Sequence, residues 1–272
     1  MRRAQMDHIL KTEKLTKHYG GVHALNDADF FLEPGEHVAV VGDNGAGKST
    51  FVRNITGVEQ PTSGRIEFYG ETVQFDSPLD ARETGIETVY QNLALADHLD
   101  VPANIFLGRE DCIDRIKIPG TKFSLPLGPL SWMKAGAMEQ HAIELLAKTG
   151  VKIPDLRESL AGMSGGQRQC VAIARAAGWG KKLIILDEPT AALGIQETTR
   201  VEEIVRGLKK QGIPVIIISH NLRQVFNLVD RIWVFRQGRI VGNRLTSETE
   251  PNEIVSMITG LDQGVHENAS YI

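Results

Sequence analysis

The chain alternates between short apolar runs and longer stretches with helical spacing. Residues 38–41, 183–186 and 215–218 are apolar and largely β-branched, which is typical of strands buried on both faces of a parallel sheet. Residues 195–210 place apolar side chains at helical intervals, and a glycine, Gly212, lies just beyond their end. A strand, a helix and a second strand in this order predict an α/β domain.

A different pattern lies on either side of the first apolar run. Residues from about 7 to 33 and from 64 to 76 alternate between apolar and polar positions, with Gly70 between two short runs. Alternation with a period of two indicates strands with one face buried and the other in solvent. We therefore expect an antiparallel β subdomain beside the α/β core.

The middle of the chain lacks the strong β-branched runs. From residue 92 to about 160 helical spacing dominates, most clearly over residues 134–148. Within this stretch, residues 111–129 contain three prolines and two glycines, a composition that predicts an extended surface loop. We expect residues 92–165 to form a helical subdomain inserted in the core, and the polar residues 263–272 to form a frayed tail.

Composition narrows the class of protein. The 272 residues are 42% hydrophobic and 24% charged, which suits one large domain with a substantial core. The N-terminal residues are polar, unlike a secretory signal, and no apolar run approaches the ~18 residues that would span a bilayer. A net charge of -4 argues against nucleic acid as a partner. Cys112 and Cys170 form no metal-ligand pattern and suit a reducing compartment.

A glycine-rich segment follows the first apolar run and fits the phosphate-binding loop pattern of glycine, four residues and Gly-Lys-Ser. Its glycines allow the backbone to wrap closely with its amides toward phosphate oxygens, and the following helix directs its positive end at the same anion. Lys48 is expected to reach the β and γ phosphates, and Ser49 to ligate magnesium. The residues expected to bind nucleotide here are Gly42, Asp43, Asn44, Gly45, Ala46, Gly47, Lys48, Ser49 and Thr50.

Two acidic residues, Asp187 and Glu188, follow the apolar run at 183–186. The strand would deliver both carboxylates to the carboxyl edge of the sheet, where α/β proteins bind ligands. Asp187 is placed to hold the magnesium shell, and Glu188 to polarise an attacking water as general base. Alone, such a pair is more often a helix-capping turn. The phosphate loop in the same chain favours the catalytic interpretation.

A second candidate anion site lies more than a hundred residues after the first. Ser164, Gly165, Gly166 and Gln167 open a helix predicted from residue 168 to about residue 177, so the serine hydroxyl and the first amides can receive an anion. A simple helix cap is the alternative interpretation. P-loop kinases and GTP switch proteins need one such site, so neither class explains why this chain has two.

The order of these motifs resembles that of the ATP-binding cassette family, the nucleotide-binding subunits of ABC transporters. The resemblance covers about residues 9–261 and rests on the phosphate loop, the Met-Ser-Gly-Gly-Gln signature at 163–167 and the acidic strand after it. It implies an α/β fold with a P-loop NTPase (RecA-like) core, an antiparallel β subdomain and an inserted α-helical signature subdomain, in one ABC ATPase domain. We expect this single domain to cover residues 1–272. Residues 1–91 and 166–262 would form the catalytic α/β core with the antiparallel β subdomain, residues 92–165 the helical subdomain and residues 263–272 a flexible tail.

The resemblance also implies roles for single residues. Tyr19 matches the aromatic residue that stacks on adenine in the family, with an ordinary strand aromatic as the alternative. Gln91 matches the glutamine that contacts magnesium and hinges the helical subdomain, and His220 matches the switch histidine that contacts the γ-phosphate. Because Glu188 and His220 are both present, we expect active hydrolysis. Gly194 departs from the family, where many members carry aspartate in a loop that communicates across the dimer.

The resemblance implies an assembly as well as an activity. In the family, two cassettes pair head to tail, and each ATP lies between the phosphate loop of one subunit and the signature of the other. This chain has one phosphate loop and one signature. The implied assembly is therefore a homodimer that uses ATP and Mg²⁺.

Four stretches resemble the bacterial monosaccharide importers, namely residues 75–86, 102–110, 190–194 and 219–221, the last two being similar to the single-cassette, fructose-type branch. The implied function is an ATPase that energises import of a fructose-, ribose- or xylose-type sugar from the cytoplasmic face of the bacterial inner membrane. The implied partners are polytopic permease subunits and, indirectly, a periplasmic or lipid-anchored sugar-binding protein. The alternative is a non-transport ABC ATPase acting on a soluble macromolecular partner, against which we count the lack of a coiled coil, zinc motif or basic arm.

Overall fold

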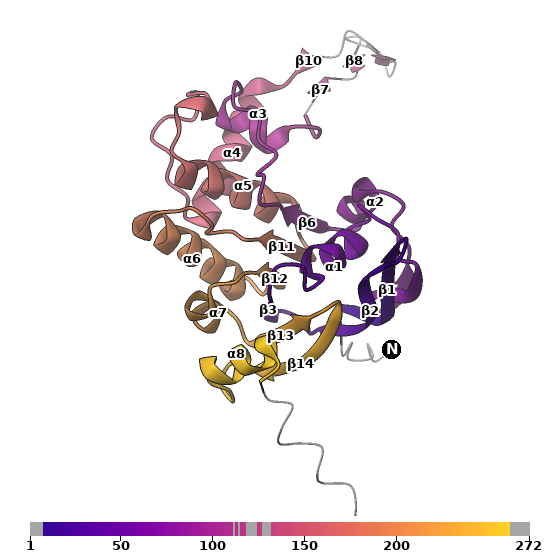
Figure 1. Cartoon of the computed structure of the whole chain (residues 1–272). Coiled ribbons are helices and arrows are strands. Elements are labelled where there is room, and N and C mark those ends of the chain that lie inside the picture. The colour runs from indigo at the N-terminus through magenta and orange to yellow at the C-terminus, as the bar shows by residue number, and fades with distance from the viewer. Residues whose placement is uncertain (1–7, 111, 114, 118–123, 127–131, 262–272) are drawn as a thin grey trace, which may run out of the picture.

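A computed structural model describes residues 8–110, 112–113, 115–117, 124–126 and 132–261, and the predicted tail at 263–272 lies outside these residues (Figure 1). The strands of its central sheet are β3 (His37–Val41), β6 (Ile86–Val89), β11 (Leu183–Asp187), β12 (Val215–Ile218), β13 (Arg231–Arg236) and β14 (Arg239–Leu245). They lie in the order β14-β13-β3-β12-β11-β6. β14 and β13 are antiparallel, and all the other neighbouring strands are parallel.

The three apolar runs of the sequence are β3, β11 and β12 at the centre of this sheet, which confirms the predicted parallel strands. Their side chains alternate between two hydrophobic cores. Ile184 and Leu186 belong to the core on the helical side, whereas Leu183 and Ile185 belong to the core shared with the antiparallel sheet. A strand with both faces buried has no solvent-facing position, which is why its sequence is continuously apolar.

A second, antiparallel sheet packs beside the first, as the alternating pattern predicted. Its strands are β1 (Leu10–Tyr19), β2 (Val22–Leu32), β4 (Ser63–Phe68) and β5 (Glu71–Val73), in the order β2-β1-β4-β5. Helices α1 (Lys48–Ile55) and α2 (Pro78–Glu83) accompany it. The ring of Phe51 in α1 lies 5.0 Å from that of Phe30 in β2 and 5.3 Å from that of Phe235 in β13. These aromatic contacts fasten the first helix between the two sheets.

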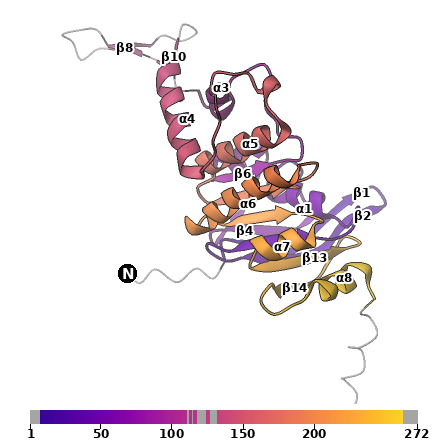
Figure 2. The same cartoon turned by 90° about the vertical axis from the view of Figure 1, so that its left-hand side faces the viewer.

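The remaining helices are α3 (Val101–Phe106), α4 (Ala135–Thr149), α5 (Gly165–Trp179), α6 (Ile195–Lys210), α7 (Leu222–Leu228) and α8 (Pro251–Thr259), with a 3-10 turn at Leu160–Gly162. Helices α3 and α4 lie beyond α5, at the end of the molecule away from α8 (Figures 1 and 2). The predicted helices at 134–148 and 195–210 are confirmed as α4 and α6. No helix in the described part of the chain is long and apolar enough to cross a membrane.

The extended loop predicted for residues 111–129 is wrong for the residues that the structure describes there. They form short antiparallel pairs: β7 (Cys112–Ile113) with β10 (Trp132–Met133), and β8 (Arg115–Lys117) with β9 (Ser124–Pro126). Proline weighed against strands in the prediction, but Pro126 lies in a two-stranded sheet, in which both strands are edge strands and a missing amide proton is tolerated. Residues 111, 114, 118–123 and 127–131 lie outside the described chain.

Candidate functional site at the carboxyl edge of the sheet

A cavity of about 650 Å³ lies where β3, β11 and β12 end. It brings together the glycine-rich loop, the acidic pair, the glutamine after β6 and the histidine after β12, as expected from the common direction of parallel strands. The predicted residues that line it are Asn44, Gly45, Ala46, Gly47, Lys48, Ser49, Thr50, Gln91, Asp187, Glu188 and His220.

The loop between β3 and α1 depends on glycine for its path. Gly42 and Gly47 have φ angles of 151° and 100°, which side chains rarely adopt. Space is also lacking, because a Cβ on Gly42 would collide with the carbonyl oxygen of Phe235, and one on Gly47 would lie 2.6 Å from that of Ala24. The loop therefore packs directly against the backbone of β13 and β2, and these contacts fix its shape.

Lys48, the first residue of α1, folds back over this loop. Its Nζ donates to the carbonyl oxygens of Gly42 at 2.7 Å and Asp43 at 2.9 Å. Burial lowers the pKa of its ammonium group, and the negative charges of Glu188, Asp43 and Asp187 oppose that change. Gly42 and Asp43 thus contribute by holding the lysine rather than by lining the cavity. Ser49 and Thr50 follow in the first turn of the helix and also line the cavity, and the amides of a first turn have no partner within their helix.

The two acids stand at the end of β11 in different surroundings. Burial raises the pKa of the Asp187 carboxyl, the charge of Glu188 raises it further, and Lys48 opposes both. Glu188 has a left-handed backbone, with φ of 51°, and its amide donates to the carbonyl oxygen of Ile218 at 2.9 Å. Its Oε1 lies 2.9 Å from Nδ1 of His220. The structure therefore pairs the predicted base with the predicted switch histidine.

Tyr19 lies outside the cavity lining. Its hydroxyl is hydrogen-bonded to the carboxylate of Glu59, and the residue is 42% exposed at the end of β1. The opposing start of β2 lines the cavity instead, through Val22, His23 and Ala24. Sequence reasoning missed these three residues, although the register that pairs Tyr19 with Val22 puts both strand ends at the same place. The adenine-stacking role of Tyr19 stays a prediction.

The signature residues lie elsewhere in the chain. Ser164 caps α5 in both directions: its Oγ accepts from the amide of Gln167 at 3.2 Å, and its own amide donates to the Gln167 side chain at 2.8 Å. This capping box confirms the predicted start of the helix. Gly166 packs closely on Glu197 of α6, where a Cβ would overlap that side chain. None of Ser164, Gly165, Gly166 and Gln167 lines the 650 Å³ cavity.

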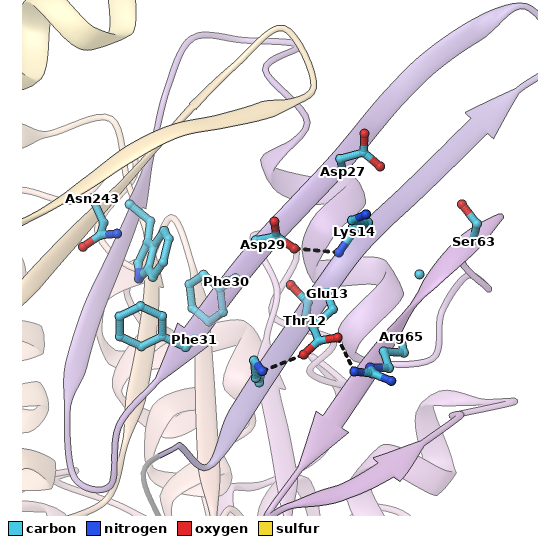
Figure 3. Close-up of a pocket in the computed structure, with 13 residues that line it drawn as sticks. Thr12, Glu13, Lys14, Asp27, Asp29, Phe30, Phe31, Ser63, Arg65 and Asn243 are labelled. Carbon is cyan, nitrogen blue, oxygen red and sulfur yellow. Dashed lines mark hydrogen bonds and ion pairs between the residues drawn. The ribbon is translucent and has the colours of Figure 1, made fainter. Parts of the chain in front are cut away.

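A larger cavity of about 910 Å³ on the antiparallel sheet does not converge on a reacting group (Figure 3). Phe30 and Phe31 lie at one end of it, and charged side chains lie along the strands at the other. Three of those charged residues pair with one another, since Glu13 lies 2.6 Å from Lys11 and also pairs with Arg65. This surface therefore lacks the combination of a cation, acids and helix amides that distinguishes the smaller cavity.

Comparisons with known proteins agree with this geometry. The family model described as ABC transporter matches residues 25–191. The fructose import ATP-binding protein of Rhizobium meliloti is 43% identical over 263 residues, 95% of this chain and 96% of that protein. The xylose/arabinose import ATP-binding protein of Sulfolobus acidocaldarius is 40% identical, over 95% of this chain and 97% of that protein. A solved ATP-binding cassette of an ABC transporter, in its ADP conformation, is 27% identical with a TM-score of 0.74, over 93% of this chain and 95% of that one.

The family match and the geometry concern the same residues. The matched segment at 25–191 contains the clamped glycine loop, the signature-capped helix and the acidic end of β11. The two relatives extend the likeness to 95% of the chain. The chain belongs to the ABC transporter family.

Proposed function

We propose that this chain is the ATP-hydrolysing subunit of a monosaccharide importer. The observation that carries the proposal is the single cavity in which Lys48, Asp187 and the Glu188–His220 pair meet. Two relatives, named as import ATP-binding proteins for fructose and for xylose or arabinose, match this chain over almost their full length. The likeness supports a sugar of this class as the transported molecule.

The cavity fits a nucleoside triphosphate. The first turn of α1 offers free amides to phosphate oxygens. The ammonium group of Lys48 lies over the glycine loop, and Lys48 lines the same cavity. In hydrolysis, water attacks the γ-phosphorus, its proton passes to the Glu188 carboxylate, and ADP leaves. His220 keeps that carboxylate in place through the 2.9 Å contact. This division of roles uses positioning and charge, which dominate phosphoryl transfer.

The same cavity offers oxygen ligands suited to Mg²⁺. Ser49, Gln91 and Asp187 all line it, and hydroxyl, amide and carboxylate oxygens are the groups that this cation prefers. The raised pKa of Asp187 shows that its negative charge is disfavoured by burial and by Glu188, so a divalent cation there would stabilise it. Magnesium would supply neutralising charge for the phosphates.

We further propose that the working form is a head-to-tail homodimer. The start of α5 presents a capped serine and glycine amides that do not reach the nucleotide cavity of the same chain. A second copy, turned so that its α5 faces this cavity, would complete both sites at once. A two-fold arrangement makes the two contacts identical, as closed symmetry requires.

The proposed partners follow from this arrangement. The sugar must be carried by polytopic permease subunits, with a periplasmic or lipid-anchored sugar-binding protein delivering it, and the cassette would act at the cytoplasmic face of the inner membrane. Residues 92–165, proposed as the helical subdomain, would transmit nucleotide state to the permease through Gln91, since this residue lies in the cavity wall and directly precedes them.

Transport by the reconstituted complex tests the proposal. Proteoliposomes containing the cassette and its co-purified membrane subunits should accumulate radiolabelled fructose, xylose or ribose when given ATP, and should fail to do so with the Lys48→Ala cassette. Recovery of the cassette with ribosomes or DNA, and without a membrane protein, would support the non-transport alternative and overturn the proposal.

A further inference from the structure

Gln224 is a buried polar residue that neither the motifs nor the nucleotide cavity include. It lies on α7, three residues after the helix cap Asn221, and is 4% exposed. Its Oε1 accepts a hydrogen bond from Oγ1 of Thr190 at 2.6 Å, and its Nε2 donates to Oε1 of Glu202 at 3.4 Å. One amide therefore joins α7, the loop after β11 and helix α6.

The loop that it holds has an unfavourable backbone. Glu188 and Ala192 have φ angles of 51° and 60°, left-handed values that residues other than glycine seldom adopt. Such conformations persist only when surrounding contacts impose them. Thr190 lies midway between the two, and its hydroxyl is fastened to Gln224. The contact is thus placed to keep the whole turn in its strained form.

The contacts close a ring around the hydrolytic pair. From Glu188 the chain runs two residues to Thr190, crosses to Gln224 by the 2.6 Å hydrogen bond, and returns along the start of α7 to His220. The 2.9 Å contact between His220 and Glu188 completes the ring. Gln224 does not line the nucleotide cavity, so it acts on that pair only through Thr190 and the helix start.

We propose that Gln224 is a positioning residue that holds the Glu188 carboxylate and the His220 imidazole in register for hydrolysis. The inference rests on the proposed function. An amide is required at this point because it accepts from Thr190 while donating to Glu202. A glutamate would place two carboxylates side by side, and a methionine of similar length would make neither bond.

The test is steady-state ATPase kinetics and ATP affinity of the full chain in its purified transporter complex. Gln224→Met should lower kcat about tenfold and leave the Kd for ATP within about twofold, because the phosphate loop does not contact this residue. Thr190→Val should show the same split, whereas Thr190→Ser, which keeps the hydroxyl, should restore kcat. The double variant Thr190→Val with Gln224→Met should be no slower than either single one, because both break the same bond.

Asn227→Leu is the matched control, since it removes an exposed amide from the same helix and should leave kcat unchanged. Unchanged kcat in Gln224→Met, or multiplied losses in the double variant, would overturn the inference. If Gln224→Met fails to fold, the comparison of Thr190→Val with Thr190→Ser decides alone: equal rates refute the proposal. Glu188→Gln distinguishes failure of this inference from failure of the proposed function, because full turnover in that variant would refute the proposed hydrolytic site itself.

Discussion

His37, the first residue of β3, makes folding stability depend on pH. It is completely buried, and its Nε2 lies 3.0 Å from the carbonyl oxygen of Ile213. Burial lowers the pKa of its imidazole from 6.5 to about 4, the charge of Lys209 acts in the same direction, and Ile213 and Asp230 oppose them. The folded protein therefore keeps His37 neutral at pH values where the unfolded chain protonates it.

The sign and size of the effect follow from this difference. Between pH 6.5 and 4 the unfolded state binds one more proton at this residue, so stability is fully present above pH 6.5 and is lost as the pH falls toward the folded-state pKa of about 4. At 1.36 kcal/mol for each pH unit, the loss is about 2 kcal/mol by pH 5 and about 3 kcal/mol by pH 4.

Urea unfolding of the nucleotide-free chain, followed by intrinsic fluorescence from pH 7.5 to 4.5, measures this loss. The variant His37→Gln retains a donor for the Ile213 carbonyl but cannot titrate, so its stability should fall less than that of the wild type by about 2 kcal/mol at pH 5. His98→Gln, which removes an exposed imidazole, is the matched control. Equal pH slopes for the wild type and His37→Gln would show that burial does not suppress protonation of His37.

Three further predictions concern the nucleotide site. Glu188→Gln should bind ATP normally, lower turnover at least a hundredfold and accumulate as an ATP-bound dimer in size-exclusion chromatography; turnover at the wild-type rate would remove its role as base. Lys48→Ala should weaken ATP binding at least tenfold in titration calorimetry, and an unchanged Kd would exclude the lysine from the phosphate site. Arg175 donates to the carbonyl oxygens of Leu93 at 2.9 Å and Ala94 at 3.0 Å, just after the cavity glutamine. Arg175→Met should therefore speed amide hydrogen exchange around these two residues and reduce permease-stimulated ATPase, with ATP affinity retained; unchanged exchange would contradict this role.

The parts of the fold that were predicted from sequence have local or strictly periodic causes. The run at 183–186 appears as β11 and the pattern at 195–210 as α6, because burial on two faces or on one helical stripe leaves a direct record in side-chain polarity. The glycine loop was found for a related reason: its backbone path excludes side chains at particular positions.

The parts that were missed depend on contacts between distant residues. β13 carries an apolar run, Ile232–Phe235, between two arginines, but its place in the sheet is set by parallel pairing with β3, far away in the sequence. Val22 and His23 enter the cavity because a hairpin turn brings them there. In the sequence Gln224 resembles any surface glutamine. It is buried only because α6 and the loop after β11 pack over it, and the pattern of residues along the chain gives no sign of that packing.

The two members of the hydrolytic pair differ sharply in exposure. The side chain of His220 is 74% exposed, whereas that of Glu188 is 18% exposed. In a single cassette the His220 imidazole is exposed to water, so water competes for its contact with the Glu188 carboxylate. On the proposed pairing, the second subunit would cover this rim, so the rate per cassette should rise with protein concentration. The open rim would then act as a safeguard against futile ATP consumption: a subunit detached from its transporter would keep its nucleotide largely intact.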